Sequence, residues 1–162
     1  MKLHLAYHKE KTTIAVGREI VEVKAFQIIV WVSISIRGIL EWDETIPKFP
    51  AILDIGNTHN LGISEEQLRK WGGIHPDSLP QMKPMRVNKQ LVPIRAASVW
   101  LHMDHAPYEL SVEQGIGVYT EGGTRLPILG LRALTNSKLQ TLIYGDQLRA
   151  VIQTPRKWYW PL

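Results

Sequence analysis

The sequence predicts a mainly β protein with one or two short helices. Three observations support this fold class. The 162-residue chain contains at least six short apolar segments with strand-like alternation, turns rich in Gly and Pro separate them, and helical patterns are confined to two short stretches. A chain of this length fits one domain with a substantial core.

The first strong strand signal begins at Phe26. Before it, residues 1–25 form an N-terminal extension or edge strand, with weak alternation over 20–24. A period-2 pattern then predicts a long half-buried strand ended by Gly38, with one side formed by Phe26, Ile28, Val30, Val32, Ile34 and Ile36. Residues 39–50 contain two prolines and suit a turn that leads back to an antiparallel partner strand.

That partner strand carries the most informative residue of the chain. The apolar run 51–53 has the character of a short buried strand, and it ends at Asp54 before a turn containing Gly56, Asn57 and Asn60. An unpaired buried carboxylate is costly, so Asp54 is a candidate functional acid. The alternative is that Asp54 only caps the turn with its side chain.

The remaining elements follow in order. Ser64-x-x-Gln67 has the form of a capping box, which predicts a short helix through Trp71 that stops at Gly72. Further elements are a loop over 74–84, a hairpin around Asn88-Lys89, a long curved strand over 92–102, strands over 108–112 and 117–120, a helix over 131–139 and a closing hairpin of 139–144 with 148–154.

Two segments together resemble the retropepsin-like aspartic proteases. The first is Ile52-Leu53-Asp54-Ile55-Gly56-Asn57-Thr58-His59, and the second is Leu126-Pro127-Ile128-Leu129-Gly130-Leu131-Arg132-Ala133-Leu134. The family has an apolar strand followed by Asp-Thr/Ser-Gly, and later an apolar pair followed by Gly and a short helix. The resemblance covers residues 26–153 as one domain and implies a closed β-barrel of the acid-protease fold.

The resemblance also implies a function. It implies an aspartic endopeptidase without a cofactor or metal, in which Asp54 is catalytic. Its active-site loop is Ile55, Gly56, Asn57 and Thr58, its flap over a bound peptide or protein substrate is Val87, Asn88, Lys89 and Gln90, and its structural support is Ile128, Leu129 and Gly130.

Aspartic proteolysis needs two carboxyl groups that share one proton across a water. No other Asp of the chain follows an apolar strand and precedes Gly and small polar residues at the required spacing. The second acid therefore has to come from another copy, which predicts a homodimer with Asp54 of both chains at the two-fold axis.

Three departures from the family pattern leave a second function open. Ile55 stands where the family has Thr or Ser, whose hydroxyl braces the two loops, Asn57 replaces a small residue, and Gly62 lengthens the turn. The alternative is a catalytically weak or inactive retropepsin-like module for peptide binding or dimerisation.

Other chemistries have less support. The chain has no Cys, which excludes disulfides and thiolate catalysis. His102 and His105 point to opposite faces of a strand end, which does not favour a metal site, and no serine-hydrolase elbow or phosphate loop is present. Without a secretory signal or an apolar run long enough to cross a membrane, we expect a cytoplasmic protein with no membrane association.

The charge and the C-terminal tail allow two interpretations each. A net charge of +4 permits nucleic-acid contact, but the basic residues are scattered, which favours an ordinary solvated surface. The aromatic tail over 154–162, with Trp158-Tyr159-Trp160, suits docking on its own protein or a neighbouring subunit, or stacking on bases or a membrane surface.

Overall fold

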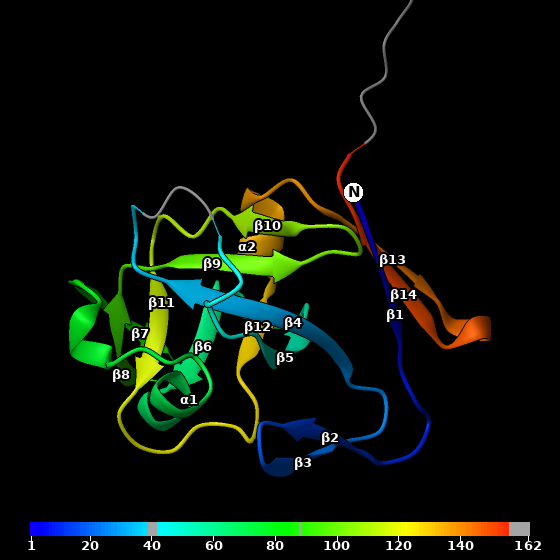
Figure 1. Cartoon of the computed structure of the whole chain (residues 1–162), viewed down its shortest axis with the longest axis horizontal. Coiled ribbons are helices and arrows are strands. Elements are labelled where there is room, and N and C mark those ends of the chain that lie inside the picture. The colour runs from blue at the N-terminus through cyan, green and yellow to red at the C-terminus, as the bar shows by residue number, and fades with distance from the viewer. Residues whose placement is uncertain (39–41, 88, 156–162) are drawn as a thin grey trace, which may run out of the picture.

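The structure, a computed structural model, describes residues 1–38, 42–87 and 89–155. The protein is mainly β with two short α-helices, as predicted (Figure 1). Asn88 of the predicted flap and the aromatic residues 158–160 of the predicted tail lie outside the described residues.

The strands and helices have the following bounds. The strands are β1 (Lys2–Ala6), β2 (Thr12–Val16), β3 (Glu19–Val23), β4 (Ile28–Ser35), β5 (Phe49–Asp54), β6 (Leu61–Ser64), β7 (Gln81–Val87), β8 (Gln90–Arg95), β9 (Ser98–His102), β10 (Pro107–Leu110), β11 (Ile116–Tyr119), β12 (Ile128–Gly130), β13 (Gln140–Tyr144) and β14 (Arg149–Gln153). The α-helices are α1 (Glu65–Lys70) and α2 (Leu131–Asn136), and two 3₁₀ turns are η1 (Pro76–Ser78) and η2 (Gly145–Gln147).

A nine-stranded sheet forms the centre of the molecule, in the order β10-β9-β4-β5-β12-β6-β11-β8-β7. β4 and β5 are antiparallel, as predicted, whereas β5 pairs with β12 in parallel and β6 with β11 in parallel. The expected closure into a barrel is wrong, because β10 and β7 remain as separate edges. Pro84 on β7 and Pro107 on β10 lack the N–H groups that a closing ladder would need.

The strand predicted from Phe26 to Ile36 is shorter than expected. Its core positions Val30, Val32 and Ile34 are buried as predicted, but Phe26 is 62% exposed and has a φ of +63°, so the chain turns there before β4 begins. The opposite side of β4 is also buried near the end of the strand, at Ser33 and Ser35. These serines are hydrogen-bonded to His102 and Trp100 of the neighbouring strand β9, which period-2 reasoning on one strand does not reveal.

Two local predictions are confirmed and two need correction. The capping box of α1 is complete, and β7 and β8 form the expected hairpin. The prediction of a single strand over 92–102 is wrong. β8 ends at Arg95 and β9 begins at Ser98, because Ala96 donates its N–H to the Pro80 carbonyl and the chain then enters β9, which lies far from β8 in the strand order of the sheet. The second helix ends at Asn136 instead of residue 139, because Ser137 forms its C-cap.

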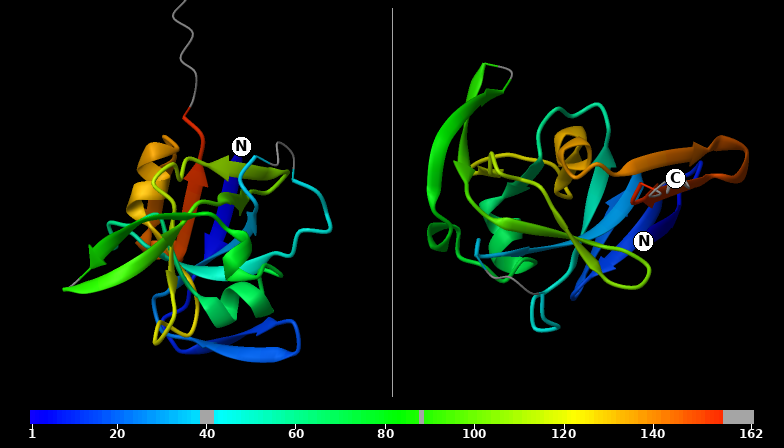
Figure 2. Two further views of the ribbon diagram at one scale, coloured as in Figure 1. Left: turned by 90° about the vertical axis from the view of Figure 1, so that its left-hand side faces the viewer. Right: turned by 90° about the horizontal axis from the view of Figure 1, so that it is seen from above.

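The N-terminal residues contribute two separate pieces. β1 joins the predicted closing hairpin to give a three-stranded sheet in the order β1-β14-β13, and β2 and β3 form a two-stranded hairpin that includes the expected edge strand over 20–24. The three-stranded sheet projects from one end of the molecule and the β7–β8 hairpin from another (Figure 2). Within the described ranges, no helix has the length and apolar character needed to cross a membrane.

Candidate active site

Strand β5 places Asp54 at the end of a buried segment. Phe49, Ala51 and Leu53 are buried and point into the core. Asp54 is half-buried and lies opposite Gly130 in the parallel pair with β12. The strand thus positions a carboxyl group at the junction between the core and solvent.

The turn after β5 is held by the Asp54 residue itself. The N–H of Gly56 donates to Asp54 Oδ1 at 2.9 Å, and the N–H of Asn57 donates to the Asp54 carbonyl at 3.1 Å. Asn57 repeats the pattern, with its Oδ1 accepting the N–H of His59 at 2.9 Å. Asp54 therefore does cap its turn, and this use of one carboxylate oxygen is compatible with chemistry at the other.

The loop after Asp54 is fastened to the start of α2. Gly130 donates its N–H to the Asn60 carbonyl at 2.9 Å, and Leu131 donates to the Asn57 carbonyl at 2.8 Å. A Cβ on Gly130 would lie 2.0 Å from the His59 carbonyl oxygen, so only glycine fits. The predicted support segment of Ile128, Leu129 and Gly130 thus directly contacts the loop, and Leu129 is fully buried.

The side chain of Asn60 anchors the loop at a second point, which the sequence analysis did not predict. Its side chain is 4% exposed, and Nδ2 donates to the Gly115 carbonyl at 3.0 Å. Asn60 Oδ1 is buried without a hydrogen-bond partner among the described residues. The only sequence signal was its identity as a turn residue, which does not predict a contact 55 positions away.

An apolar surface flanks the candidate acid. Ile55 is 55% exposed and Leu131, which follows the partner residue of Asp54, is 43% exposed. Thr58 and Gly56 are also exposed. Ile55 of the loop and Leu131 at the start of α2 therefore present large apolar side chains on this surface, and position 55 lacks the hydroxyl of the family pattern.

The hairpin that carries the predicted flap lies next to this loop. Met85, Val87, Val92 and Ile94 of the β7–β8 hairpin share a small pocket with Asn57, His59 and Asn60. Gln90 is exposed and Lys89 has a φ of +67°, as the turn of a tight hairpin requires. Asp54 does not line this pocket. In a single chain the loop and the hairpin therefore border a pocket that lies beside Asp54.

The surroundings of His59 in this loop lower its pKa. Partial burial of the imidazole lowers its pKa, and the nearby Arg132 guanidinium lowers it further by repulsion. The imidazole therefore stays neutral at pH values at which an exposed histidine begins to bind a proton.

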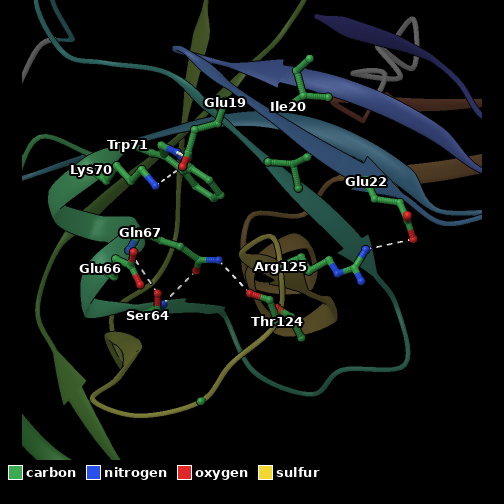
Figure 3. Close-up of a pocket in the computed structure, with 12 residues that line it drawn as sticks. Glu19, Ile20, Glu22, Ser64, Glu66, Gln67, Lys70, Trp71, Thr124 and Arg125 are labelled. Carbon is green, nitrogen blue, oxygen red and sulfur yellow. Dashed lines mark hydrogen bonds and ion pairs between the residues drawn. The ribbon is translucent and has the colours of Figure 1, made fainter.

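A separate pocket of about 500 Å³ lies between β3 and α1 (Figure 3). Glu19 pairs there with Lys70 and accepts the indole N–H of Trp71 at 3.1 Å, while Arg125 pairs with Glu22 at 2.9 Å. Ion pairs between residues far apart in the sequence close its two ends, and no local sequence motif indicated them.

His102, one of the two histidines considered for metal binding, has other neighbours. His102 Nε2 lies 2.7 Å from Ser33 Oγ, and burial followed by repulsion from Lys48 lowers its pKa. Among the residues that the structure describes, no group of three or more His, Asp or Glu side chains is arranged to hold a metal ion.

Two sequence comparisons with known proteins find no relative. No protein-family model matches the chain, and no curated protein matches it in a sequence search. The assignment of function therefore depends on the residues and geometry described above.

Proposed function

We propose that this protein is a retropepsin-like aspartic endopeptidase that acts as a homodimer. The observation that carries the proposal is the position of Asp54, a half-buried carboxyl at the end of a core strand whose loop is fastened to Gly130 and Leu131. The two segments that resemble the family in sequence are adjacent in space, because β5 and β12 pair in parallel with Asp54 opposite Gly130.

The fold supports the same proposal without a closed barrel. A retropepsin-like arrangement needs the Asp loop, the supporting Gly segment and a hairpin at one end of a sheet. Here loop 54–60 contacts the β12–α2 junction and shares a pocket with the β7–β8 hairpin. A second copy would supply the missing half of the cleft, since one carboxyl group alone makes the site chemically incomplete.

The proposed reaction uses the two Asp54 side chains as one acid and one base. The ionised carboxylate takes a proton from water as the water oxygen bonds to the carbonyl carbon of the peptide, and the protonated carboxyl gives its proton to the carbonyl oxygen. As the resulting diol collapses and its C–N bond breaks, the protonated carboxyl gives its proton to the leaving nitrogen, and the other carboxylate takes the proton of a diol hydroxyl as the C=O bond re-forms. Water is thereby added across the peptide bond and the dyad again holds one proton.

A binding or dimerisation module on the same scaffold is the second candidate, and Ile55 favours it. Its exposed side chain cannot donate the hydrogen bond that a hydroxyl would use to brace two loops. An apolar contact between loops would still join two chains, without fixing the carboxyl groups at the separation that catalysis needs.

Cleavage of a peptide library by the wild type, Asp54→Asn and Ile55→Thr separates the two functions. We expect wild-type cleavage to be fastest at mildly acidic pH, where the dyad holds one proton, and Asp54→Asn to abolish it while the protein stays folded and dimeric. If loop bracing limits the rate, Ile55→Thr should increase cleavage, although an unpartnered hydroxyl would cost about 1–3 kcal/mol of stability. A dimeric wild type and a dimeric Ile55→Thr that both cut no peptide from acidic to neutral pH would favour the module.

A further inference from the structure

The pocket between β3 and α1 is bordered by an unpaired strand edge. Among the described residues β3 pairs only with β2, in a separate two-stranded sheet. The consecutive residues 19–22 of β3 all line the pocket. Because successive side chains of a strand point to opposite faces, consecutive residues line one pocket when the edge of the strand faces it. The free edge of β3 therefore faces the pocket, opposite α1 (Figure 3).

The backbone of this edge has groups that are free to bind a further strand. Val16 and Glu19 close a two-residue turn in which Gly17 has a φ of +60°. The closing pair of such a hairpin is hydrogen-bonded, and bonded and non-bonded pairs then alternate along an antiparallel ladder. The N–H and C=O groups of Ile20 and Glu22 therefore point away from β2. No other backbone group of the described residues hydrogen-bonds to them.

The wall opposite β3 is fixed, yet it leaves room for a strand. Gln67 of α1 is buried, and its Nε2 donates to the Thr124 carbonyl at 2.8 Å. Arg125 pairs with Glu22 of β3 at 2.9 Å. A helix or loop usually protects a free edge by covering it. Here the space between them is about 500 Å³, which lies within the range of roughly 300–1,000 Å³ that is usual for ligand pockets.

The charges of the pocket favour a cationic ligand. Its two basic side chains are already paired, Lys70 with Glu19 and Arg125 with Glu22. The remaining carboxylate that lines the pocket, Glu66 of α1, is exposed and forms no ion pair among the described residues. The pocket therefore retains one uncompensated negative charge, on the side opposite the free edge of β3.

We propose that this pocket binds an extended segment of another polypeptide, which adds a strand to β3 and places a Lys or Arg side chain at Glu66. Main-chain hydrogen bonds to Ile20 and Glu22 give affinity for an extended backbone, and the Glu66 carboxylate selects its charge. The ring of Trp71, whose indole N–H is bound by Glu19, lies in the wall of the pocket and suits the alkyl part of a basic side chain.

This peptide site goes beyond the proposed peptidase and does not depend on it. Neither Asp54 nor any other residue of loop 54–60 lines the pocket, and β12 does not line it either. Loss of binding at β3 would therefore leave the peptidase proposal standing, and a protein that cuts no peptide could still bind one at this edge.

An NMR titration of the isotope-labelled full chain tests the site. Asp54→Asn is introduced in every protein, so that the proposed chemistry cannot consume the peptide. The probe is a peptide of alternating Thr and Lys, and the matched probe has Glu in place of Lys. We expect the basic peptide to bind roughly tenfold more tightly than the acidic one. It should shift the amide signals of Ile20 and Glu22, and not those of Thr13 and Ala15 on β2.

Two proline variants test the strand pairing. Ala15 and Ile20 form a cross-strand pair, and both are exposed. By the alternation of the ladder both N–H groups point outward, so Pro at either position removes no bond between β2 and β3. Ile20→Pro removes a donor from the edge that faces the pocket, and we expect it to weaken binding of the basic peptide about tenfold. Ala15→Pro removes the matching donor from the opposite edge and should leave binding unchanged.

Glu66→Lys tests the charge, with Glu113→Lys as the control that makes the same change of charge at an exposed site outside the pocket. We expect Glu66→Lys to reverse the preference between the two peptides and Glu113→Lys to keep it. The proposal is overturned if the basic peptide does not bind at millimolar concentration, if both proline variants weaken binding equally, or if Glu66→Lys keeps the preference. Peptide-induced shifts confined to loop 54–60 would place the peptide at the candidate active site instead. Shifts of Ile20 and Glu22 that depend on protein concentration without peptide would assign the edge to a second copy, and either result also overturns the proposal.

Discussion

Loop 54–60 and the β7–β8 hairpin border the same pocket but are held in opposite ways. The loop is fastened to a different part of the chain by backbone bonds from Gly130 and Leu131 and by the buried side chain of Asn60. The hairpin pairs with β11 only at its base, through Ile94 and Arg95, and its outer part has no further strand beside it among the described residues. The proposed peptidase would need such a division, with one wall that fixes the acid and another that moves to admit a peptide.

Gly130→Ala, which disrupts the fixed loop, should have the largest effect on stability of the predicted changes. The new Cβ would lie 2.0 Å from the His59 carbonyl oxygen, which is backbone and cannot move away without breaking the fastening of the loop. We expect a loss of about 3 kcal/mol or more in the free energy of unfolding by urea, together with loss of dimer and of cleavage.

Gly145→Ala is the matched control for that change. No atom lies within 4 Å of a Cβ at this position, and its φ is not in the left-handed region. Its unfolding free energy should stay within about 0.5 kcal/mol of the wild type. Equal effects of the two substitutions would show that Gly130 does not have the special role assigned to it.

Amide hydrogen exchange should show whether the β7–β8 hairpin opens more readily than the centre of the sheet. β4 is flanked by β5 and β9, whereas among the described residues 85–87 and 90–92 pair only with each other, next to a register shift between Met82 and Met85. We expect amides in the outer hairpin to exchange roughly 100-fold faster than those of Val30 and Val32. Equal protection in the two regions would contradict a movable flap and leave the fastened loop unaffected.

The same contrast explains which features were predictable from the sequence. The place of Asp54 at the end of a strand, the capping box of α1 and the β7–β8 hairpin depend on neighbours in the chain. Each of these features has a local sequence pattern. The open edges of the sheet, the strand β1 and the hydrogen bond of Asn60 to Gly115 depend on residues that meet only after folding. Alternation over 92–102 was also compatible with either one strand or two, because a break at two buried alanines leaves the pattern nearly intact.

His59→Gln gives the smallest expected effect and separates loop stability from catalysis. Folding lowers the pKa of His59 below its ordinary value of 6.5, through burial and then repulsion by Arg132. Between the ordinary and the lowered pKa the unfolded chain binds more protons, so the free energy of unfolding should fall as the pH falls through that window. Glutamine does not titrate, so the variant should lose less stability than the wild type between pH values of about 7.5 and 5 in urea unfolding. Arg132→Gln should give an intermediate loss, because burial is the larger cause and remains. If all three proteins lose equal stability over this range, folding does not lower the pKa of His59, and its burial does not contribute to the pH dependence of stability.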